Sequence, residues 1–473
     1  MEITCTDEEI FIFKKISEAA DELKIPAFII GGFVRDKILN RKTKDADIVC
    51  IGNGIELANK TAEKFPAKPN VIFFKNFGTA QIKIPLNGNF FEIEFIGARK
   101  ESYNHNSRKP DVLPGSIDED RMRRDFTINT LSASLDKKNF FEIIDPLNGL
   151  EDIKNKTIKT PLPPDQTFID DPLRMMRAIR FAAQLNFDIL LETFHAIQQN
   201  AERIKIVSGE RIIDEINKII LTKKPSLGFD LLYKSGLLKI IFPQMVALVG
   251  AEFIDGKGHK DNFYHTLQVL DNISLHTDDI WLRWSAILHD IAKPVTKKFE
   301  KGHGWTFHGH EVLGGRMVPK IFAQLKLPLN EKMKFVKKMV ELHLRPISLT
   351  KENITDSAIR RLLFDAGDDI ESLMMLCKAD ITSKNKQKAA RFLDNFEMVE
   401  KRLKEVEESD HLRNWQPPIT GEIIMKEFNL PPSRIVGEIK NAVREAILDG
   451  EIPNDYNAAF EYMKKTAKNL GVK

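Results

Sequence analysis

The chain has few of the features that would place it in a membrane or in an oxidising compartment. It contains three cysteines in 473 residues, Cys5, Cys50 and Cys377, and none forms a Cys-x-x-Cys pair. This odd, widely spaced set argues against a disulfide framework and a thiolate zinc site, so we expect reduced, structural thiols. No apolar run approaches the ~18 residues of a membrane helix. Residues 1–9 are acidic where a signal peptide would be basic, so we expect a cytoplasmic protein without a membrane partner.

Strong charge of one sign is also missing. The formal net charge is only +3, which leaves no global footprint for nucleic acid. Basic residues instead gather locally, between Lys37 and Lys44 and between Arg99 and Arg124. We find no internal repeat and no low-complexity tract. The length and the 42% hydrophobic and 29% charged residues are typical of a globular protein of about three domains.

The hydrophobic patterns predict an α+β protein. Strand-like runs at 27–30, 71–74, 79–84 and 90–96 predict a mixed sheet with helices, and Asn87-Gly88-Asn89 predicts a hairpin turn. Beyond about residue 150 a helical period takes over, which predicts an all-α remainder. Breaks near 161–164, 250–262 and 414–418 separate the parts. The predicted domains are a head at 1–150, a helical neck at 151–250, a metal-binding helical domain at 251–390 and a helical tail at 391–473.

Two carboxylates, Asp45 and Asp47, stand one residue apart at the start of an apolar run. On a strand both would point to the same face, which suits a divalent metal. Upstream, the Gly31-Gly32 turn follows a short apolar strand and opens a helix near Phe33, where free backbone N–H groups suit phosphate. Either element alone is commonly a solvated strand end or a simple turn. Together, in this order, they indicate phosphoryl or nucleotidyl transfer.

This arrangement resembles the first motif, Gly-Gly-x-Val-Arg-Asp and then Asp-x-Asp, of the nucleotidyltransferase superfamily that includes DNA polymerase beta. Within it, the chain is most similar to the class II bacterial tRNA CCA-adding enzymes and poly(A) polymerases. The resemblance implies a polymerase-beta-like head in which Asp45 and Asp47 hold two Mg²⁺ ions. It also implies that Gly31, Gly32 and Arg35 contact the triphosphate.

A third carboxylate is expected on the strand-like run 90–96, where Glu92 and Glu94 share one face. In the family this residue lies a few positions before an arginine, and Glu94 before Arg99 fits best, so Glu94 is the third predicted catalytic residue. We interpret Glu92 as a solvent-facing residue of a half-buried strand.

The string Arg-Arg-Asp-Phe-Thr-Ile-Asn resembles the second motif of the family, with Arg123, Arg124, Asp125 and Asn129 at the matching positions. Asp and Asn at this spacing can read a ribose 2′-hydroxyl, and an arginine fork suits phosphate oxygens. We predict that Arg124, Asp125 and Asn129 bind nucleotide. For Asp125 alone, a helix N-cap is an equally common use.

Asp171 and Arg174 stand three residues apart near a predicted helix start, so both should emerge on one face. A carboxylate that accepts from an exocyclic amine, beside a guanidinium that donates to a ring nitrogen, accepts C and A and rejects U and G. The segment resembles the templating motif Glu-Asp-x-x-Arg, with Asp170 in place of Glu. A surface salt bridge is the alternative. Arg177 and Arg180, further along this helix, complete the predicted nucleotide-binding set.

Two further stretches resemble supporting motifs. Asp145 followed by Gly149 resembles the third motif, which we interpret as a structural joint between head and neck. Residues 209–215 resemble the last neck motif, in which an arginine and a glutamate support the template helix.

A separate set of histidines and aspartates begins at residue 265. The adjoining pair His289-Asp290 ends an apolar helix, and such a pair with outlying His and Asp residues provides a metal-ligand set, although a lone histidine is more often a core or surface residue. His308 also lies in this stretch. The set resembles the HD phosphohydrolase superfamily. The resemblance implies a site that binds a divalent transition metal and a domain that hydrolyses cyclic phosphates or phosphate ends. The core positions are His265, His289, Asp290 and Asp380, and His310 and His343 stand where two-metal members carry extra ligands.

The predicted function is template-independent addition of CCA to tRNA 3′ ends from CTP and ATP. A poly(A) polymerase is one alternative, but residues 74–79 lack the basic Gly-Arg-Arg-Phe-type string of that branch. Addition of only CC or only A is another, and a basic stretch at 99–114, with Tyr103, His105, Arg108 and Lys109, favours full addition. An RNA-binding or HD signalling protein with an inactive head is the alternative of another class.

Overall fold

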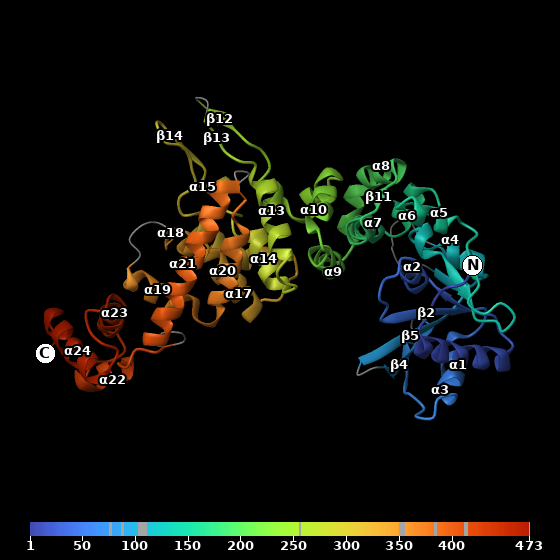
Figure 1. Ribbon diagram of the computed structural model, residues 1–473, viewed down its shortest axis with the longest axis horizontal. Helices are drawn as coiled ribbons and strands as arrows, with labels where there is room; N and C mark the ends of the chain where they lie inside the picture. The colour runs from blue at the N-terminus through green and yellow to red at the C-terminus, as the bar shows by residue number, and fades with distance from the viewer. Residues whose placement is uncertain are drawn as a thin grey trace. The chain divides into compact units, whose positions relative to one another are not determined.

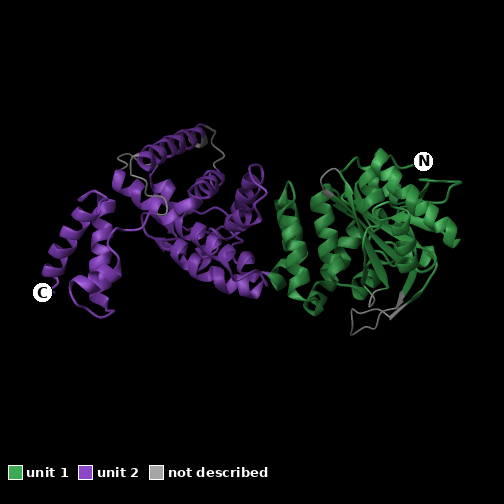
Figure 2. Ribbon diagram, turned by 90° about the horizontal axis from the view of Figure 1, so that it is seen from below, with its two compact units in different colours: residues 1–241 green, residues 242–473 purple. Residues whose placement is uncertain are grey.

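The computed structural model describes residues 1–74, 78–86, 89–102, 111–254, 257–349, 355–382, 386–410 and 415–472. The chain divides into two compact units, residues Met1–Ile241 and Phe242–Lys473 (Figure 2). The first unit contains a mixed sheet followed by helices, and the second is largely helical. The predicted α+β class is confirmed.

The sheet of the first unit has seven strands in the order β3-β4-β5-β2-β1-β8-β9. Strand β2 runs parallel to β5, and the other neighbours pair antiparallel. The strands predicted at 27–30, 71–74, 79–84 and 90–96 are all present, and pairing of Leu86 with Asn89 closes the predicted hairpin between the last two. Residues 87 and 88 of its turn lie outside the described ranges. The strands are β1 (Ala27–Ile30), β2 (Asp45–Cys50), β3 (Val71–Phe74), β4 (Thr79–Leu86), β5 (Asn89–Gly97), β8 (Ser132–Ser134) and β9 (Ile143–Ile144).

One face of this sheet is covered by helices α1 (Asp7–Leu23) and α3 (Gly54–Glu63), which pack against each other (Figure 1). Phe13 of α1 meets Phe33 and Phe91 edge to face, at ring distances of 5.2 and 6.2 Å. Because side chains alternate along β5, the aromatic and aliphatic residues that include Phe91 fill this core, and Glu92 and Glu94 point to the opposite face. The apolar core therefore lies on one face of the sheet, and the acidic side chains of β5 lie on the other face.

The other helices of the first unit lie between strands of the sheet or after it. They are α2 (Gly32–Ile38), α4 (Ile117–Met122), α5 (Gly149–Lys154), α6 (Pro164–Asp170), α7 (Leu173–Leu185), α8 (Leu191–Asn200), α9 (Gly209–Ile220), α10 (Pro225–Lys234) and α11 (Leu237–Ile241). The Asp145 carboxylate accepts hydrogen bonds from the backbone N–H groups of Gly149 and Leu150, at 2.8 and 2.9 Å. A Cβ at Gly149 would lie 2.5 Å from the Thr127 carbonyl oxygen. The glycine thus permits close backbone packing, which agrees with a structural role for this motif.

The second unit contains a helical bundle and a C-terminal group of three helices. The bundle includes α13 (Asn262–Ser274), α14 (Ile280–Leu288), α15 (Lys293–Thr296), α16 (His310–Gln324), α17 (Glu331–Leu342), α18 (Leu344–Leu349), α19 (Asp356–Ala366), α20 (Ile370–Ala379) and α21 (Lys386–Asp410). The last helices, α22 (Gly421–Glu427), α23 (Arg434–Asp449) and α24 (Tyr456–Asn469), enclose their own core of residues such as Ile424 and Val443. Within the described ranges, no helix is both long and apolar enough to cross a bilayer.

The expectation of an all-α remainder was wrong in detail. Three short strand pairs follow the sheet: β10 (Thr157–Ile158) with β11 (Asp188–Ile189), β12 (Phe253–Ile254) with β13 (Lys257–Gly258), and β14 (Lys298–Glu300) with β15 (Gly304–Thr306). Each strand has two or three residues. A strand of this length is too short to show an alternating pattern, so it leaves no signal in the sequence.

Candidate active site and metal centre

The three predicted catalytic carboxylates lie on one face of the sheet. Asp45 and Asp47 are on β2, and Glu94 on the parallel neighbour β5 stands in register with Asp47, as Glu92 does with Asp45. Residues at one register position point to the same face, so all four acids share it. Glu92 binds Lys83 on the next strand, and both side chains are at least 40% exposed, which agrees with a solvent-facing role.

The Gly31-Gly32 turn brings the helix start of α2 to these acids. Gly31 has φ +81°, and a Cβ there would lie 3.0 Å from Arg124 Nη1 and 3.8 Å from Asp47 Oδ2. A side chain at Gly31 would therefore be both strained and crowded. The predicted turn, the Asp pair and Arg124 of the second motif converge at this point.

Electrostatics at this face favour a bound cation. Burial raises the pKa of Asp47 to about 6; the Arg124 cation opposes this shift, and Glu94 and Asp45 reinforce it. Three carboxylates close enough to repel one another form a hard oxygen donor set of the kind that Mg²⁺ prefers. The residues therefore fit a divalent metal.

Behind the acids, a buried hydrogen-bond chain joins the first two motifs to α7. Arg35 Nη1 donates to Asn129 Oδ1 at 2.6 Å, Asn129 Nδ2 donates to Asp125 Oδ1 at 2.9 Å, and Arg177 Nε donates to Asp125 Oδ2 at 2.7 Å. Burial alone would raise the pKa of Asp125, but Arg177, Asn129 and Arg174 hold it well below its usual range. Asp125 precedes a single 3₁₀ turn, Thr127–Asn129, whose N-cap is Phe126. Its main partners are thus side chains of the site.

Arg123 and Arg124 are held by a carboxylate to which the sequence reasoning gave no role. Asp120 is fully buried, and its two oxygens bind Arg123 Nη2 at 2.5 Å and Arg124 Nη2 at 3.2 Å. The signal for this role is local, because an acid three and four residues before two arginines on a helix can pair with both.

The predicted base-reading residues stand at the start of α7. Asp171 Oδ1 accepts from the Leu173 backbone N–H at 3.1 Å, and its Oδ2 lies 3.5 Å from Arg211 Nη2. Arg174 Nη2 donates to the Arg123 carbonyl oxygen at 2.5 Å. In the part of the chain that the structure describes, Asp171 and Arg174 form no ion pair with each other, so the surface salt bridge is not observed. Asp170 Oδ1 accepts from Gln166 at 2.6 Å.

The last neck motif supports α7 as predicted. Arg180 Nε binds the buried Glu215 carboxylate at 2.6 Å, and Arg211 approaches Asp171. The buried ring of Phe181, which the sequence reasoning did not single out, lies against three guanidinium groups: those of Arg180, Arg35 and Arg177, whose Cζ atoms are 3.9, 4.9 and 5.4 Å from the ring centroid.

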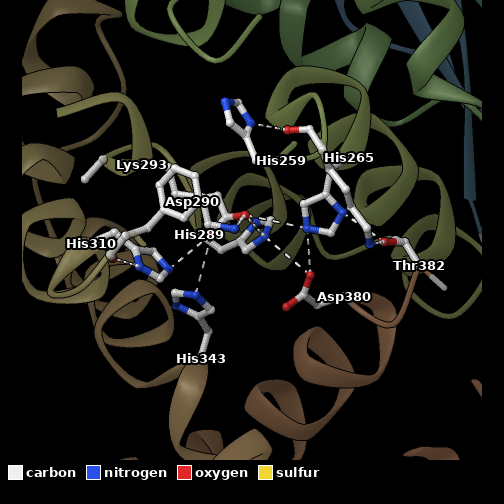
Figure 3. Close-up of polar contacts among 12 residues, drawn as sticks. His259, His265, His289, Asp290, Lys293, His310, His343, Asp380 and Thr382 are labelled. Atoms are coloured by element: carbon white, nitrogen blue, oxygen red, sulfur yellow. Dashed lines mark hydrogen bonds and ion pairs between the residues drawn. The ribbon is translucent and has the colours of Figure 1, made fainter. Parts of the chain in front are cut away.

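In the second unit, the predicted histidines and aspartates converge from five helices (Figure 3). His265 lies on α13, His289 and Asp290 follow α14, and His310 begins α16. His343 and Asp380 directly follow α17 and α20. Four helix ends, those of α14, α17 and α20 and the start of α16, therefore bring ligands to one point.

Asp290 lies between two groups of nitrogen donors. Its Oδ2 is 3.5 Å from His265 Nε2 and 3.2 Å from His289 Nε2, and its Oδ1 is 3.2 Å from His310 Nε2 and 3.9 Å from His343 Nε2. Asp380 Oδ1 approaches His265 Nε2 at 2.9 Å. Two sets, His265 with His289 and Asp290, and Asp290 with His310 and His343, could each hold a metal ion.

The outer nitrogens of the histidines are fixed by the fold. The Nδ1 atoms of His289, His310 and His343 lie 2.6–2.7 Å from main-chain carbonyl oxygens, and that of His265 lies 2.9 Å from Thr382 Oγ1. This orients each Nε2 inward, as in metal sites. Among the residues that the structure describes, the buried Nε2 atoms of His289, His310 and His343 find no partner with hydrogen-bond geometry, so the residues fit bound metal.

Ionisation within this cluster is uneven. Burial alone would lower the pKa of His289, but the carboxylates of Asp290 and Asp380 raise it to about 10. The pKa of His343 is lowered to about 4, because the residue is buried and lies beside His289. Lys293, which had no assigned role, binds Asp290 Oδ2 at 2.6 Å and stands three residues after it on the same turn. His308 is exposed and does not join the cluster.

The fold and these sites define a nucleotidyltransferase with an HD domain, and comparison with known families agrees. Three family models match: "Poly A polymerase head domain" over residues 27–159, "Probable RNA and SrmB- binding site of polymerase A" over 186–248, and "HD domain" over 262–385.

Relatives of known type extend over much of the chain. A "Multifunctional CCA protein" from Psychromonas ingrahamii is 30% identical over 64% of this chain and 70% of its own length. An "A-adding tRNA nucleotidyltransferase" from Aquifex aeolicus is 40% identical, but over 40% of this chain and 22% of its own length. A second "A-adding tRNA nucleotidyltransferase", from Deinococcus radiodurans, is 28% identical over 72% of this chain and 77% of its own length. The chain therefore belongs to the CCA-adding and tRNA nucleotidyltransferase family, and the resemblance seen in the motifs is confirmed.

Solved structures show the same fold. A CCA-adding enzyme in complex with ATP has a TM-score of 0.64 at 20% identity, covering 98% of this chain and 96% of that one. A tRNA nucleotidyltransferase complexed with a primer tRNA and an ATP analogue has a TM-score of 0.57 at 25% identity, covering 81% and 99%.

Proposed function

We propose that this protein adds CCA to the 3′ end of tRNA, using CTP and ATP. The observation that carries the proposal is the meeting of Asp45, Asp47 and Glu94 on one face with the Gly31 turn and Arg124. In this proposal residues 1–150 form the catalytic head, 151–250 the neck that selects the nucleotide and contacts RNA, 251–390 the HD domain and 391–473 the tail. Relatives of this kind are described as bound to tRNA, ATP or CTP.

In the head, Asp45, Asp47 and Glu94 would hold Mg²⁺, which when bound activates the attacking oxygen and stabilises charge on the leaving one. The 3′-hydroxyl oxygen of the RNA forms a bond to the α-phosphorus of the nucleotide. The bond from that phosphorus to the bridging oxygen breaks, pyrophosphate leaves with the electron pair, and the hydroxyl proton passes to water. In this proposal Arg124, which lies beside Gly31, pairs with the triphosphate.

Arg35, a predicted triphosphate contact, has its side chain deep in the protein. It is 4% exposed, and it binds Asn129 and, at 2.9 Å, Asp36. We propose that Arg35, Asn129 and Asp125 act together, each fixing the next, and thereby position Arg177 at the nucleotide.

Base choice is assigned to Asp171 and Arg174. Each is tethered by a separate partner, Arg211 for the carboxylate and the Arg123 carbonyl oxygen for the guanidinium. Because the two side chains do not neutralise each other, their acceptor and donor groups can both face a base that offers an amine beside a ring nitrogen.

In the HD domain, we propose metal-dependent hydrolysis of cyclic phosphates or phosphate ends. The inward-facing Nε2 atoms of His289, His310 and His343 around Asp290 support bound divalent transition metal, which when bound supplies an activated water and a Lewis acid. Lys293 beside Asp290 would pair with the substrate phosphate.

A second candidate is addition of A alone, which is favoured by the two relatives of the A-adding type. The four residues named in the basic stretch that argued for full addition lie within 103–110, outside the described ranges. The test supplies tRNAs that end at the discriminator base, at the first C and at CC, with each labelled NTP singly and in pairs, and sequences the products. CCA on the shortest tRNA supports the proposal. AMP incorporation only after CC would establish the A-adding alternative, and long A tails a poly(A) polymerase.

A further inference from the structure

A cavity of about 310 Å³ opens beside Glu94 in the head. Its lining residues come from β3, β4, β5 and the start of β6 (Arg99–Ser102). They are Phe74, Thr79, Gln81, Glu94, Ile96 and Arg99. The volume is near the lower end of the ~300–1,000 Å³ range of small-molecule sites.

The strand order places this cavity on a definite side of the acids. Gln81 on β4 stands in register with Glu94 on β5, which stands in register with Asp47 on β2. On the other side of Asp47 comes β1, whose Ile30 pairs with Asp47 and leads directly into Gly31. The acids therefore separate the Gly31 turn and Arg124 from the cavity.

Phosphoryl transfer requires the attacking and leaving oxygens to be roughly in line, on opposite sides of the phosphorus. In the proposed function the leaving pyrophosphate lies toward Gly31 and Arg124. As the new bond from the RNA 3′-oxygen to the α-phosphorus forms and the bond to pyrophosphate breaks, the RNA end must approach from the side of the cavity.

The lining suits the end of a nucleic acid strand. Phe74 is 42% exposed, a high fraction for a large aromatic side chain, and Arg99 brings a cation to the same cavity. A ring can stack on any base, so it tolerates acceptors that end in different bases, and a guanidinium suits a phosphodiester. We propose that this cavity holds the 3′-terminal nucleotide of the RNA acceptor, with its base on Phe74 and its phosphate at Arg99. This inference rests on the proposed function.

The adjacent Phe73 provides a matched control. It is 44% exposed on the same edge strand, but it points to the opposite face and does not line the cavity. We expect Phe74→Ala to raise the KM for tRNA about tenfold, the scale of one lost base stack, with the KM for NTP unchanged. Phe73→Ala should change neither, and Phe74→Tyr should restore the wild-type value. An unchanged KM for tRNA in Phe74→Ala, or an equal loss in Phe73→Ala, would overturn the inference.

A binding readout separates this inference from the proposed function. RNA that ends in fluorescent 2-aminopurine should be quenched when it binds wild-type protein and Phe73→Ala, but far less on Phe74→Ala at saturating protein. Equal quenching on Phe74→Ala would refute the assignment. If the wild-type protein adds no nucleotide to any tRNA, the proposed function fails, and the quenching still decides whether an RNA end stacks on Phe74.

Discussion

The carboxylate of Asp125 binds the guanidinium of Arg177 at 2.6 Å, and this pair joins the second motif to helix α7. The Asp125 side chain is buried and that of Arg177 is 35% exposed, and Asn129 and Arg35 continue the chain on the other side of Asp125. The geometry of the nucleotide site therefore depends on a buried polar network, and its members can be tested one at a time.

Asp125→Asn should lower the free energy of unfolding by about 2 kcal/mol, because it removes a charge-assisted hydrogen bond while the remaining Arg177 cation keeps partial contact with solvent. The Asp125 pKa is depressed in the folded state, so its stabilisation is complete above the ordinary Asp value of about 3.9 and is lost as the pH falls below it. Urea denaturation at pH 7 and at pH 3 measures both effects. Glu92→Gln is the control, since its exposed pair with Lys83 should contribute less than about 1 kcal/mol.

Asp45→Ala or Asp47→Ala should abolish incorporation of both CMP and AMP while tRNA binding is retained. Both carboxylates belong to the same proposed metal face, so neither can replace the other. Glu92→Ala, on that face but bound to Lys83, should keep most of the activity. Incorporation by either aspartate variant in a gel assay would remove the two-metal assignment.

Mg²⁺ binding to the head should weaken below about pH 6. The pKa of Asp47 is raised to about 6, so proton binding stabilises the metal-free fold at low pH, and this stabilisation is lost as the pH rises through 6. Metal needs the carboxylate, so the apparent affinity should fall up to about tenfold per pH unit below that value. Activity against Mg²⁺ concentration at pH 5 to 8 gives the profile, which Glu92→Gln should leave unchanged. An affinity that does not vary between pH 5 and 7 would contradict the role of Asp47.

Asp171→Asn should let UTP or GTP compete with CTP and ATP. The carboxylate accepts from the amine of C and A, and each lost or unpaired hydrogen bond costs about 1 to 3 kcal/mol, which is roughly tenfold or more in selectivity. The measurement is relative kcat/KM for all four NTPs. Asp214→Asn, which removes only an exposed pair with Lys218, is the control. Unchanged nucleotide ratios at a lower rate would show that α7 supports the fold and that the base is read elsewhere.

His289→Ala combined with Asp290→Ala should abolish metal-dependent hydrolysis of 2′,3′-cyclic nucleotides and spare nucleotide addition. Metal analysis should show loss of bound transition metal, because the double variant removes a shared carboxylate and a buried nitrogen. His308→Ala removes an exposed neighbour and should change neither property. Loss of nucleotide addition at unchanged protein stability would show that the two activities are coupled.

Short-range patterns in the sequence were enough for much of this protein. Short apolar runs located the strands at 27–30 and 71–74, and the two-residue period of a strand placed Asp45 and Asp47 on one face, because side-chain direction follows backbone period alone. The predicted metal-binding residues from His265 to Asp380 were picked out only by resemblance, and the folded chain brings their side chains together.

The tertiary structure decided which of these residues are partners. Arg177 binds Asp125, 52 residues earlier in the sequence, and Arg174 binds the Arg123 carbonyl oxygen, 51 residues earlier. Phe181 lies against three arginines. No periodicity encodes such contacts, since they depend on how helices pack on the sheet. The cavity beside Glu94 exists for the same reason: it is formed by the order of strands in space, and the order of residues along the chain does not contain it.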